Sequence, residues 1–187
     1  MLMNDLRNVF KQVWEGDIKN NYSNQKINME RGLQAEMYRS LKNQIEKENS
    51  SYDIWVEPTL YFDNDCLIQR SRPDLLISTN FEIQCIVEIK YNPSGGIFFH
   101  DDIEKLRIFS EQAGNNQIHL IPNPNTGYWI KEKKFTISEN VLCVFAVIAH
   151  AASEALYQDR WKDINLPNNF LHLTGIVTGN GFSFKAL

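Results

Sequence analysis

The sequence lacks the long apolar runs that mark membrane and secreted proteins. Its longest apolar run, Val141–Ala149, is well short of the roughly 20 residues that a membrane helix needs. We therefore expect a buried strand there and no membrane partner. The first ten residues contain no extended apolar stretch of the kind that a signal peptide requires, so none is expected.

Cysteine is also scarce. The chain has three cysteines, Cys66, Cys85 and Cys143, and none belongs to a Cys-x-x-Cys motif or stands beside a histidine. Each lies in an apolar run, which favours a reduced thiol buried in the core over a disulfide or a zinc ligand. Reduced thiols indicate a reducing compartment, so a cytoplasmic location is expected.

Positive charge is not in excess. Nineteen Lys and Arg stand against 23 Asp and Glu, which gives a net charge of −4. This balance argues against a non-specific coat for nucleic acid. A nuclease remains compatible with it, because carboxylates at a metal site add negative charge that the bound cation offsets. Affinity for DNA would then come from a local basic face, from a second copy in a homodimer, or from a partner protein that supplies targeting.

The chain has enough apolar material for one folded unit. Its 187 residues are 43% hydrophobic and 12% aromatic, which suits a single domain with its own core. We expect residues 1–187 to form that domain, without a repeat or a linker.

Hydrophobic periodicity predicts both helices and strands. Helices are expected at 4–14, 29–48, 101–111 and 150–161. Strands are expected at 54–62 and 66–70 (a hairpin), 75–78, 81–91, 117–121, 141–148, 170–177 and 182–185, with loops at 15–28 and 122–134. This order predicts an α/β fold with a mixed central sheet flanked by helices.

The segment from Arg72 to Lys90 carries the chemistry. It contains Pro73-Asp74 and, on the following predicted strand, Glu88 and Lys90. These two charged residues are two positions apart, so their side chains share one face of the strand. Their neighbours are apolar, and a buried charged pair is costly unless something binds it. A divalent cation suits Asp74 and Glu88, because Mg²⁺ prefers carboxylate and water oxygens.

This pattern resembles the PD-(D/E)xK, or restriction-endonuclease-like, superfamily over residues 33–106. The group has an acidic residue in an early helix, then Pro-Asp, then (Asp/Glu)-x-Lys on the next strand. The resemblance implies a mixed sheet flanked by helices and hydrolysis of phosphodiesters that depends on Mg²⁺, with Mn²⁺ as a substitute. It implies that Asp74 and Glu88 bind the metal, that Lys90 is the catalytic lysine, and that Glu36 is the helix acid, which binds the metal directly or through water.

Simple electrostatics supports the same roles. A phosphodiester is anionic and resists attack by hydroxide. A metal held by Asp74 and Glu88 would neutralise it and lower the pKa of a bound water. Lys90 would orient that water or stabilise the growing negative charge.

Each of these residues also has a purely structural interpretation. Asp74 follows a proline and could be a turn residue at the start of a strand. Glu88 and Lys90 could form a solvent-facing ion pair, and Glu36 could be solvated or paired with Arg39 or Ser40.

Asp102 and Lys105 open the next predicted helix, where members of the resembling family often carry a similar phrase. Capping and solvation explain these two residues equally well, so we treat them as secondary candidates.

The sequence therefore predicts a metal-dependent nuclease with DNA as its substrate, of restriction, defence or repair type. One alternative is a PD-(D/E)xK-like domain that no longer cuts and serves as a binding or regulatory subunit of a larger complex. Another is an unrelated α/β protein whose motif is accidental, which would place Asp74 far from Glu88.

Overall fold

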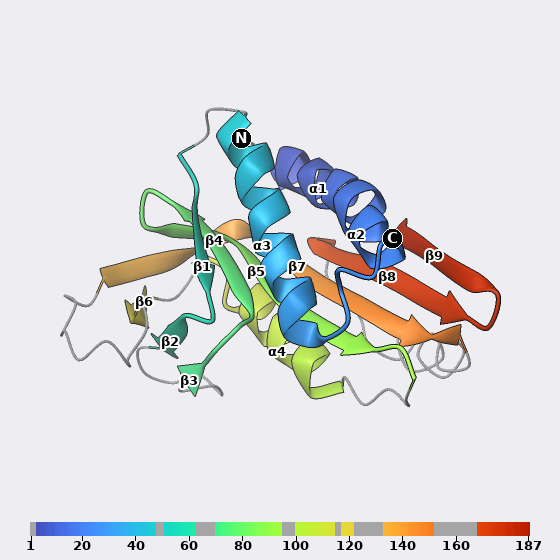
Figure 1. Ribbon diagram of the computed structural model, residues 1–187. Helices are drawn as coiled ribbons and strands as arrows, with labels where there is room; N and C mark the ends of the chain where they lie inside the picture. The colour runs from blue at the N-terminus through green and yellow to red at the C-terminus, as the bar shows by residue number, and fades with distance from the viewer. Residues whose placement is uncertain are drawn as a thin grey trace.

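The computed structural model describes residues 3–47, 51–62, 70–94, 100–114, 117–121, 133–151 and 168–187. Within these residues a nine-stranded mixed sheet has helices on both faces (Figure 1). The predicted α/β architecture with a mixed central sheet flanked by helices is confirmed.

The first helix is longer than predicted. It consists of α1 (Met3–Gln12), a π-helical segment η1 (Val13–Ile18) and α2 (Lys19–Ser23). The expected loop at 15–28 is therefore wrong from residue 15 to residue 23. Trp14 and Ile18 are completely buried, and the Trp14 indole N–H donates to the carbonyl oxygen of Thr174 over 3.1 Å. These tertiary contacts maintain the helix through a segment of low helical propensity.

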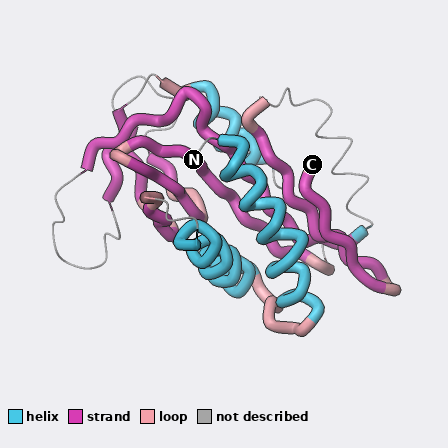
Figure 2. The backbone as a smooth tube through the Cα atoms, turned by 90° about the horizontal axis from the view of Figure 1, so that it is seen from above, coloured by secondary structure: helices cyan, strands magenta, loops and turns pink. Residues whose placement is uncertain are grey.

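The second predicted helix is confirmed as α3 (Glu30–Lys47). Its stripe of Leu33, Met37, Leu41 and Ile45 is buried against the sheet. The helices α1 and α3 lie side by side over this face (Figure 2).

The strands run in the order β1-β4-β5-β7-β6-β2-β3, and β8 and β9 continue from β7. Their bounds are β1 Asp53–Val56, β2 Thr59–Phe62, β3 Arg70–Ser71, β4 Leu75–Thr79, β5 Glu82–Asn92, β6 Gln117–Ile121, β7 Lys133–His150, β8 Phe170–Thr178 and β9 Gly181–Ala186. The central strands β5, β7 and β8 are parallel, and all other pairs are antiparallel.

The hairpin predicted for 54–62 and 66–70 is only partly right. Strand β2 does pair with β3, but β1 pairs with β4 on the far side of the sheet order. Glu57 has a positive φ of 47°, and the following Pro58 has no N–H for a ladder. These two residues divide the expected strand in two, and residues 63–69 lie outside the described part.

Strand β7 begins earlier than expected. Its first residues pair with β6, and its second half lies between β5 and β8. The end of the expected loop at 122–134 is therefore strand, while 122–132 and most of the expected helix at 150–161 lie outside the described residues.

The helix α4 (His100–Glu111) follows β5 in the chain, lies with β6 in the connection to the parallel strand β7, and packs on the other face of the sheet. Its buried face consists of Ile103, Leu106 and Phe109, which join a core with Ile86 and Phe145. The expected helix at 101–111 is thus confirmed.

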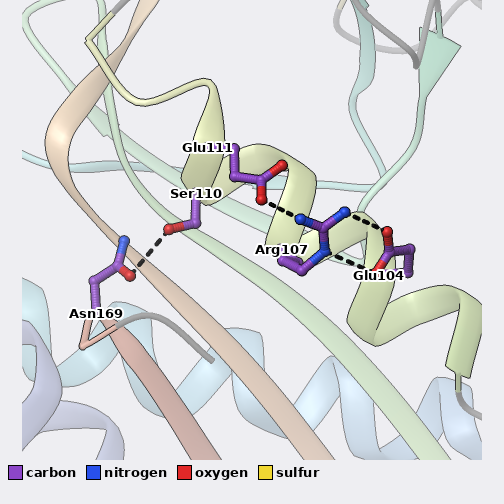
Figure 3. A network of polar contacts seen from close by, with 5 residues as sticks. All are labelled: Glu104, Arg107, Ser110, Glu111 and Asn169. Carbon is purple, nitrogen blue, oxygen red and sulfur yellow. Dashed lines mark hydrogen bonds and ion pairs between the residues drawn. The ribbon is translucent and has the colours of Figure 1, made fainter. Parts of the chain in front are cut away.

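Polar contacts fix the C-terminal half of α4 (Figure 3). Ser110 Oγ lies 3.0 Å from Oδ1 of Asn169, which stands directly before β8 and also donates to the carbonyl oxygen of Val141. Arg107 is paired with Glu104 and Glu111 along the outer side of the helix. The helix is therefore held against the sheet by both apolar and polar contacts.

Two expectations from the sequence can be checked directly. Cys85 and Cys143 are buried free thiols, as predicted, and Cys66 lies outside the described residues. Among the helices that the structure describes, none has the length and apolar character to cross a membrane.

Candidate metal centre

Asp74 and Glu88 meet on neighbouring strands. The β4–β5 register pairs Leu75 with Val87, so the next step of the antiparallel pair places Asp74 opposite Glu88. Side chains alternate along a strand, and Val87 faces the α1–α3 side, so Glu88 faces α4. The structure thus brings together the two acids that the sequence pattern singled out.

Backbone contacts fix Asp74. Its Oδ2 accepts a hydrogen bond from the N–H of Ile89 over 2.6 Å, which ties its carboxylate to β5. Its carbonyl oxygen accepts hydrogen bonds from Gln34 Nε2 at 3.1 Å and from the N–H of Glu57 at 3.0 Å. The turn after Pro73 therefore presents the carboxylate to the acid on the next strand.

Glu88 is deeply buried. Its side chain belongs to a residue only 3% exposed, and Oε1 has no hydrogen-bond partner within the part of the chain that the structure describes. This burial excludes the solvent-facing ion pair considered from the sequence. Burial, and then the neighbouring charge of Asp74, raise the pKa of Glu88 to about 8. A buried carboxyl oxygen without a partner is unusual in folded proteins, so this oxygen is free to accept a further contact.

Asp74 has a related but smaller perturbation. Burial raises its pKa to about 6, against the lowering effect of the Ile89 N–H and the Lys90 ammonium. Two adjacent buried carboxyl groups resist ionising together unless a cation joins them. The pair therefore holds protons more tightly than exposed carboxyl groups do.

Lys90 lies on the same face but is paired with α4. Its Nζ is 3.3 Å from Oδ2 of Asp102, and its side chain is 23% exposed. Burial opposes the charged form, but the carboxylates of Asp102, Glu30 and Asp74 outweigh it and raise the pKa of Lys90. The side chain therefore remains an ammonium, which suits stabilisation of negative charge and not proton abstraction.

The secondary candidates Asp102 and Lys105 belong to this site. Asp102 is largely buried, and its Oδ1 lies 2.9 Å from Lys105 Nζ while its other oxygen faces Lys90. Lys105 lowers the pKa of Glu88 more strongly than Lys90 does, although burial has the largest effect and raises it. Solvation and capping are therefore not their only roles.

Glu36 is placed elsewhere. Its Oε2 accepts hydrogen bonds from Arg39 at 2.6 Å and from Asn21 Nδ2 at 2.7 Å, so the pairing with Arg39 considered from the sequence is observed. Glu36 points away from the acids because of its position around the axis of α3. Gln34 points from α3 to Asp74, and a residue two positions further lies about 200° around the helix. The structure does not bring Glu36 together with the acids on β4 and β5.

Glu30 is a charged residue of α3 near this site that the sequence analysis did not consider. It lies four residues before Gln34, hence on the same side of α3, and its Oε2 is 3.4 Å from the N–H of Tyr91. Its charge contributes to raising the pKa of both Asp74 and Lys90. The spacing of positions 30, 34, 37 and 41 places Glu30 on the side of α3 that faces the sheet, although Glu30 itself is exposed.

The donor set fits a small divalent ion. Within the described residues no group of three or more His, Cys, Asp or Glu side chains is arranged to hold a metal. Mg²⁺ does not need one, because proteins commonly bind it through one or two carboxylates, with water and substrate phosphates as the other ligands. Asp74 and Glu88 supply two carboxylates, and Oε1 of Glu88 has no partner among the described residues.

Comparison of the chain with models of known protein families, with curated proteins and with solved structures gives no match in any of the three. The functional interpretation therefore depends on the geometry of the site and on the motif that carries it.

Proposed function

We propose that this chain is a metal-dependent nuclease of the PD-(D/E)xK type that hydrolyses phosphodiester bonds, with DNA as its substrate. One observation carries the proposal. Glu88, buried and with a carboxyl oxygen that has no partner in the described chain, lies beside Asp74 on the face that also carries Lys90. Neither carboxylate has an arginine or lysine as its direct ion-pair partner within the described residues, so the pair is available to a cation.

The roles of the residues follow from their positions. Asp74 and Glu88 would hold Mg²⁺ or Mn²⁺, which supplies Lewis acidity at a phosphate oxygen and makes a bound water more acidic. Lys90 keeps its proton and stabilises the negative charge that develops on the phosphoryl oxygens. The N–H of Ile89 holds the Asp74 carboxylate in one orientation toward Glu88.

The surrounding architecture supports the proposal. The strands that carry the acids belong to a mixed sheet, with α3 before them in the chain and α4 after them. This is the frame that the resemblance implies for a restriction-endonuclease-like core. The net charge of −4 gives the chain little general attraction for a polyanion. We therefore propose that a second copy or a partner protein supplies part of the DNA affinity and the targeting.

A catalytically silent binding or regulatory subunit is the second candidate. The observation that favours it is that no group of three or more metal-ligating side chains forms within the described residues, and Glu36 is turned toward Arg39. Such a protein would bind the metal or DNA without cutting.

One assay separates these candidates. The protein is incubated with plasmid, linear duplex, single-stranded DNA and RNA, each with Mg²⁺, with Mn²⁺ and with a chelator. The nuclease proposal predicts cleavage of DNA only with metal, and its loss in Asp74→Asn, Glu88→Gln and Lys90→Met.

Glu82→Gln is the matched control, because Glu82 lies on the same strand at its opposite end. It should cut as the wild type does. Metal binding without cleavage, measured by calorimetry on the same samples, would favour the silent subunit. Cleavage that persists in Glu88→Gln would remove the proposed site.

A further inference from the structure

One carboxylate holds two ammonium groups beside the acidic centre. Asp102 faces Lys90 with Oδ2 at 3.3 Å and Lys105 with Oδ1 at 2.9 Å. Lys90 comes from β5, whereas Lys105 comes from α4, one turn after Asp102. The side chain of Asp102 is 14% exposed and that of Lys105 is 42% exposed, so the carboxylate is enclosed while the second ammonium remains accessible.

In this arrangement Lys90 and Lys105 form their ion pairs with Asp102 and not with Asp74 or Glu88, within the described residues. A lysine so close to two carboxylates would ordinarily form an ion pair with one of them and compete with a cation. Here the ion-pair partner of Lys90 is Asp102, which comes from α4. Asp74 and Glu88 are therefore left to bind a cation, and Lys90 stays beside them as an ammonium.

The charge balance gives Lys105 a role of its own. Three carboxylates, Asp74, Glu88 and Asp102, line this face together with the ammonium groups of Lys90 and Lys105. Lys105 therefore adds a second ammonium to a face that is rich in carboxylates. A phosphodiester is anionic, so this second ammonium would help to attract it.

The position of Asp102 is fixed by the rest of α4. Ile103 and Leu106 anchor the helix in the core, and Ser110 ties its last turn to Asn169 (Figure 3). Groups that orient a reacting side chain need this kind of rigid support.

We propose that Asp102 is a positioning residue for Lys90 and that Lys105 is a second contact for the substrate phosphate. The phosphodiester would lie between the two ammonium groups on one side and the Asp74–Glu88 pair on the other. This inference rests on the proposed nuclease function, and it assigns two residues outside the PD-(D/E)xK motif.

Kinetics on a defined DNA duplex with Mg²⁺ tests both roles. Asp102→Asn should lower kcat about tenfold or more, the loss expected for one charge-assisted hydrogen bond, with a smaller change in KM. Lys105→Met should raise KM by roughly the same factor with a smaller change in kcat. Lys105→Arg should recover most of the affinity, because it keeps the charge and the donors. Asp101→Asn is the control, since Asp101 is the exposed neighbour in the same turn.

Labelling of lysine amines provides a readout that does not depend on activity. Trace acetylation, followed by mass spectrometry, reports how easily each ammonium loses its proton. Asp102→Asn should speed the labelling of Lys90 and Lys105 and leave that of the exposed Lys42 unchanged. The DNA duplex should slow the labelling of Lys105 in the wild type.

The outcomes are distinguishable. If Asp102→Asn and Lys105→Met match Asp101→Asn in both kinetics and labelling, the inference is wrong even though the enzyme cuts. If the wild type cuts nothing with any metal, the proposed function fails. In that case the labelling of Lys105 still tests the phosphate contact: slower labelling with DNA supports the contact, and unchanged labelling excludes it. Should Asp102→Asn not fold, the two Lys105 variants decide the question, because that side chain is partly exposed.

Discussion

The N–H of Ile89 donates to Oδ2 of Asp74 over 2.6 Å, so the acid directly before β4 is held by the backbone of β5. The residue that supplies this N–H lies between Glu88 and Lys90. Ile89 is the middle residue of the Glu88-Ile89-Lys90 motif, so its N–H holds the Asp74 carboxylate beside the strand that carries Glu88 and Lys90. This contact gives the aspartate a structural role that can be separated from its charge.

Two substitutions of Asp74 should separate these roles. Asp74→Asn keeps an oxygen that can accept from Ile89 but removes the charge, so it should abolish metal binding with little loss of stability. Asp74→Ala also leaves the Ile89 N–H without its partner, which should cost a further ~1–3 kcal/mol of unfolding free energy. Urea denaturation without metal measures the stability, and calorimetric titration with Mn²⁺ measures the binding. Equal stabilities of the two variants would contradict the structural role.

The metal-free protein should lose stability as the pH rises from 6 to 8. The pKa of Glu88 is about 8 in the folded protein and 4.5 ordinarily, so over this range the folded state retains a proton that the unfolded state has released. Stability therefore falls with increasing pH, by at most about 1.4 kcal/mol per pH unit for one group. Asp74, with a pKa of about 6, adds to the slope only below that range.

Glu88→Gln should flatten this dependence between pH 6 and 8, and Glu82→Gln should not. Urea denaturation in chelator at several pH values measures it. A slope that is unchanged in Glu88→Gln would show that another group is responsible.

Metal should stabilise the protein by displacing the proton from Glu88. Mn²⁺ or Mg²⁺ binds the folded state only, so it should raise the melting temperature of the wild type, and more at pH 8 than at pH 6. Calorimetry near pH 7, in two buffers of different ionisation enthalpy, should detect up to one proton released per ion. Glu88→Gln should show neither effect, whereas a wild-type melting temperature that is independent of metal would exclude the centre.

The placement of Glu88 and Lys90 on one buried strand was predictable because the sequence pattern that indicates it is local. Alternation along one strand places Glu88 and Lys90 on a single face, and the apolar neighbours mark that strand as buried. The α/β architecture followed in the same way from the order of helical and strand-like segments. Neither inference required knowledge of what lies far away in the chain.

The position of Glu36 could not be predicted in this way, because the direction in which a helix side chain points depends on how α3 is rotated against the sheet. That rotation is set by long-range contacts such as Gln34 to Asp74, which no local pattern contains. The pairing of β1 with β4 also depends on residues far apart in the chain. In the sequence, the break between β1 and β2 is marked by Pro58, next to Glu57 with its positive φ. From the sequence, capping or solvation explained Lys105 as well as a role in the site did, and only the position of α4 over the sheet shows its contact with Asp102.

Two glycines test the packing of the sheet and of the first helix. An added Cβ at Gly175 in β8 would lie 3.0 Å from both Ile148 Cγ1 and Phe184 Cε1, whereas a Cβ at Gly16 in η1 would meet nothing within 4 Å. Gly175→Ala should therefore destabilise the protein by about 1–3 kcal/mol through overpacking.

Gly16→Ala should instead stabilise the protein by about 0.4–1 kcal/mol, because alanine reduces the freedom of the unfolded chain and favours a helical backbone. Urea denaturation measures both variants, with metal absent so that the acidic centre does not contribute. Because Gly16 lies where the sequence predicted a loop, its response also tests the continuous helix. A Gly16→Ala variant less stable than the wild type would contradict a helical backbone at that position.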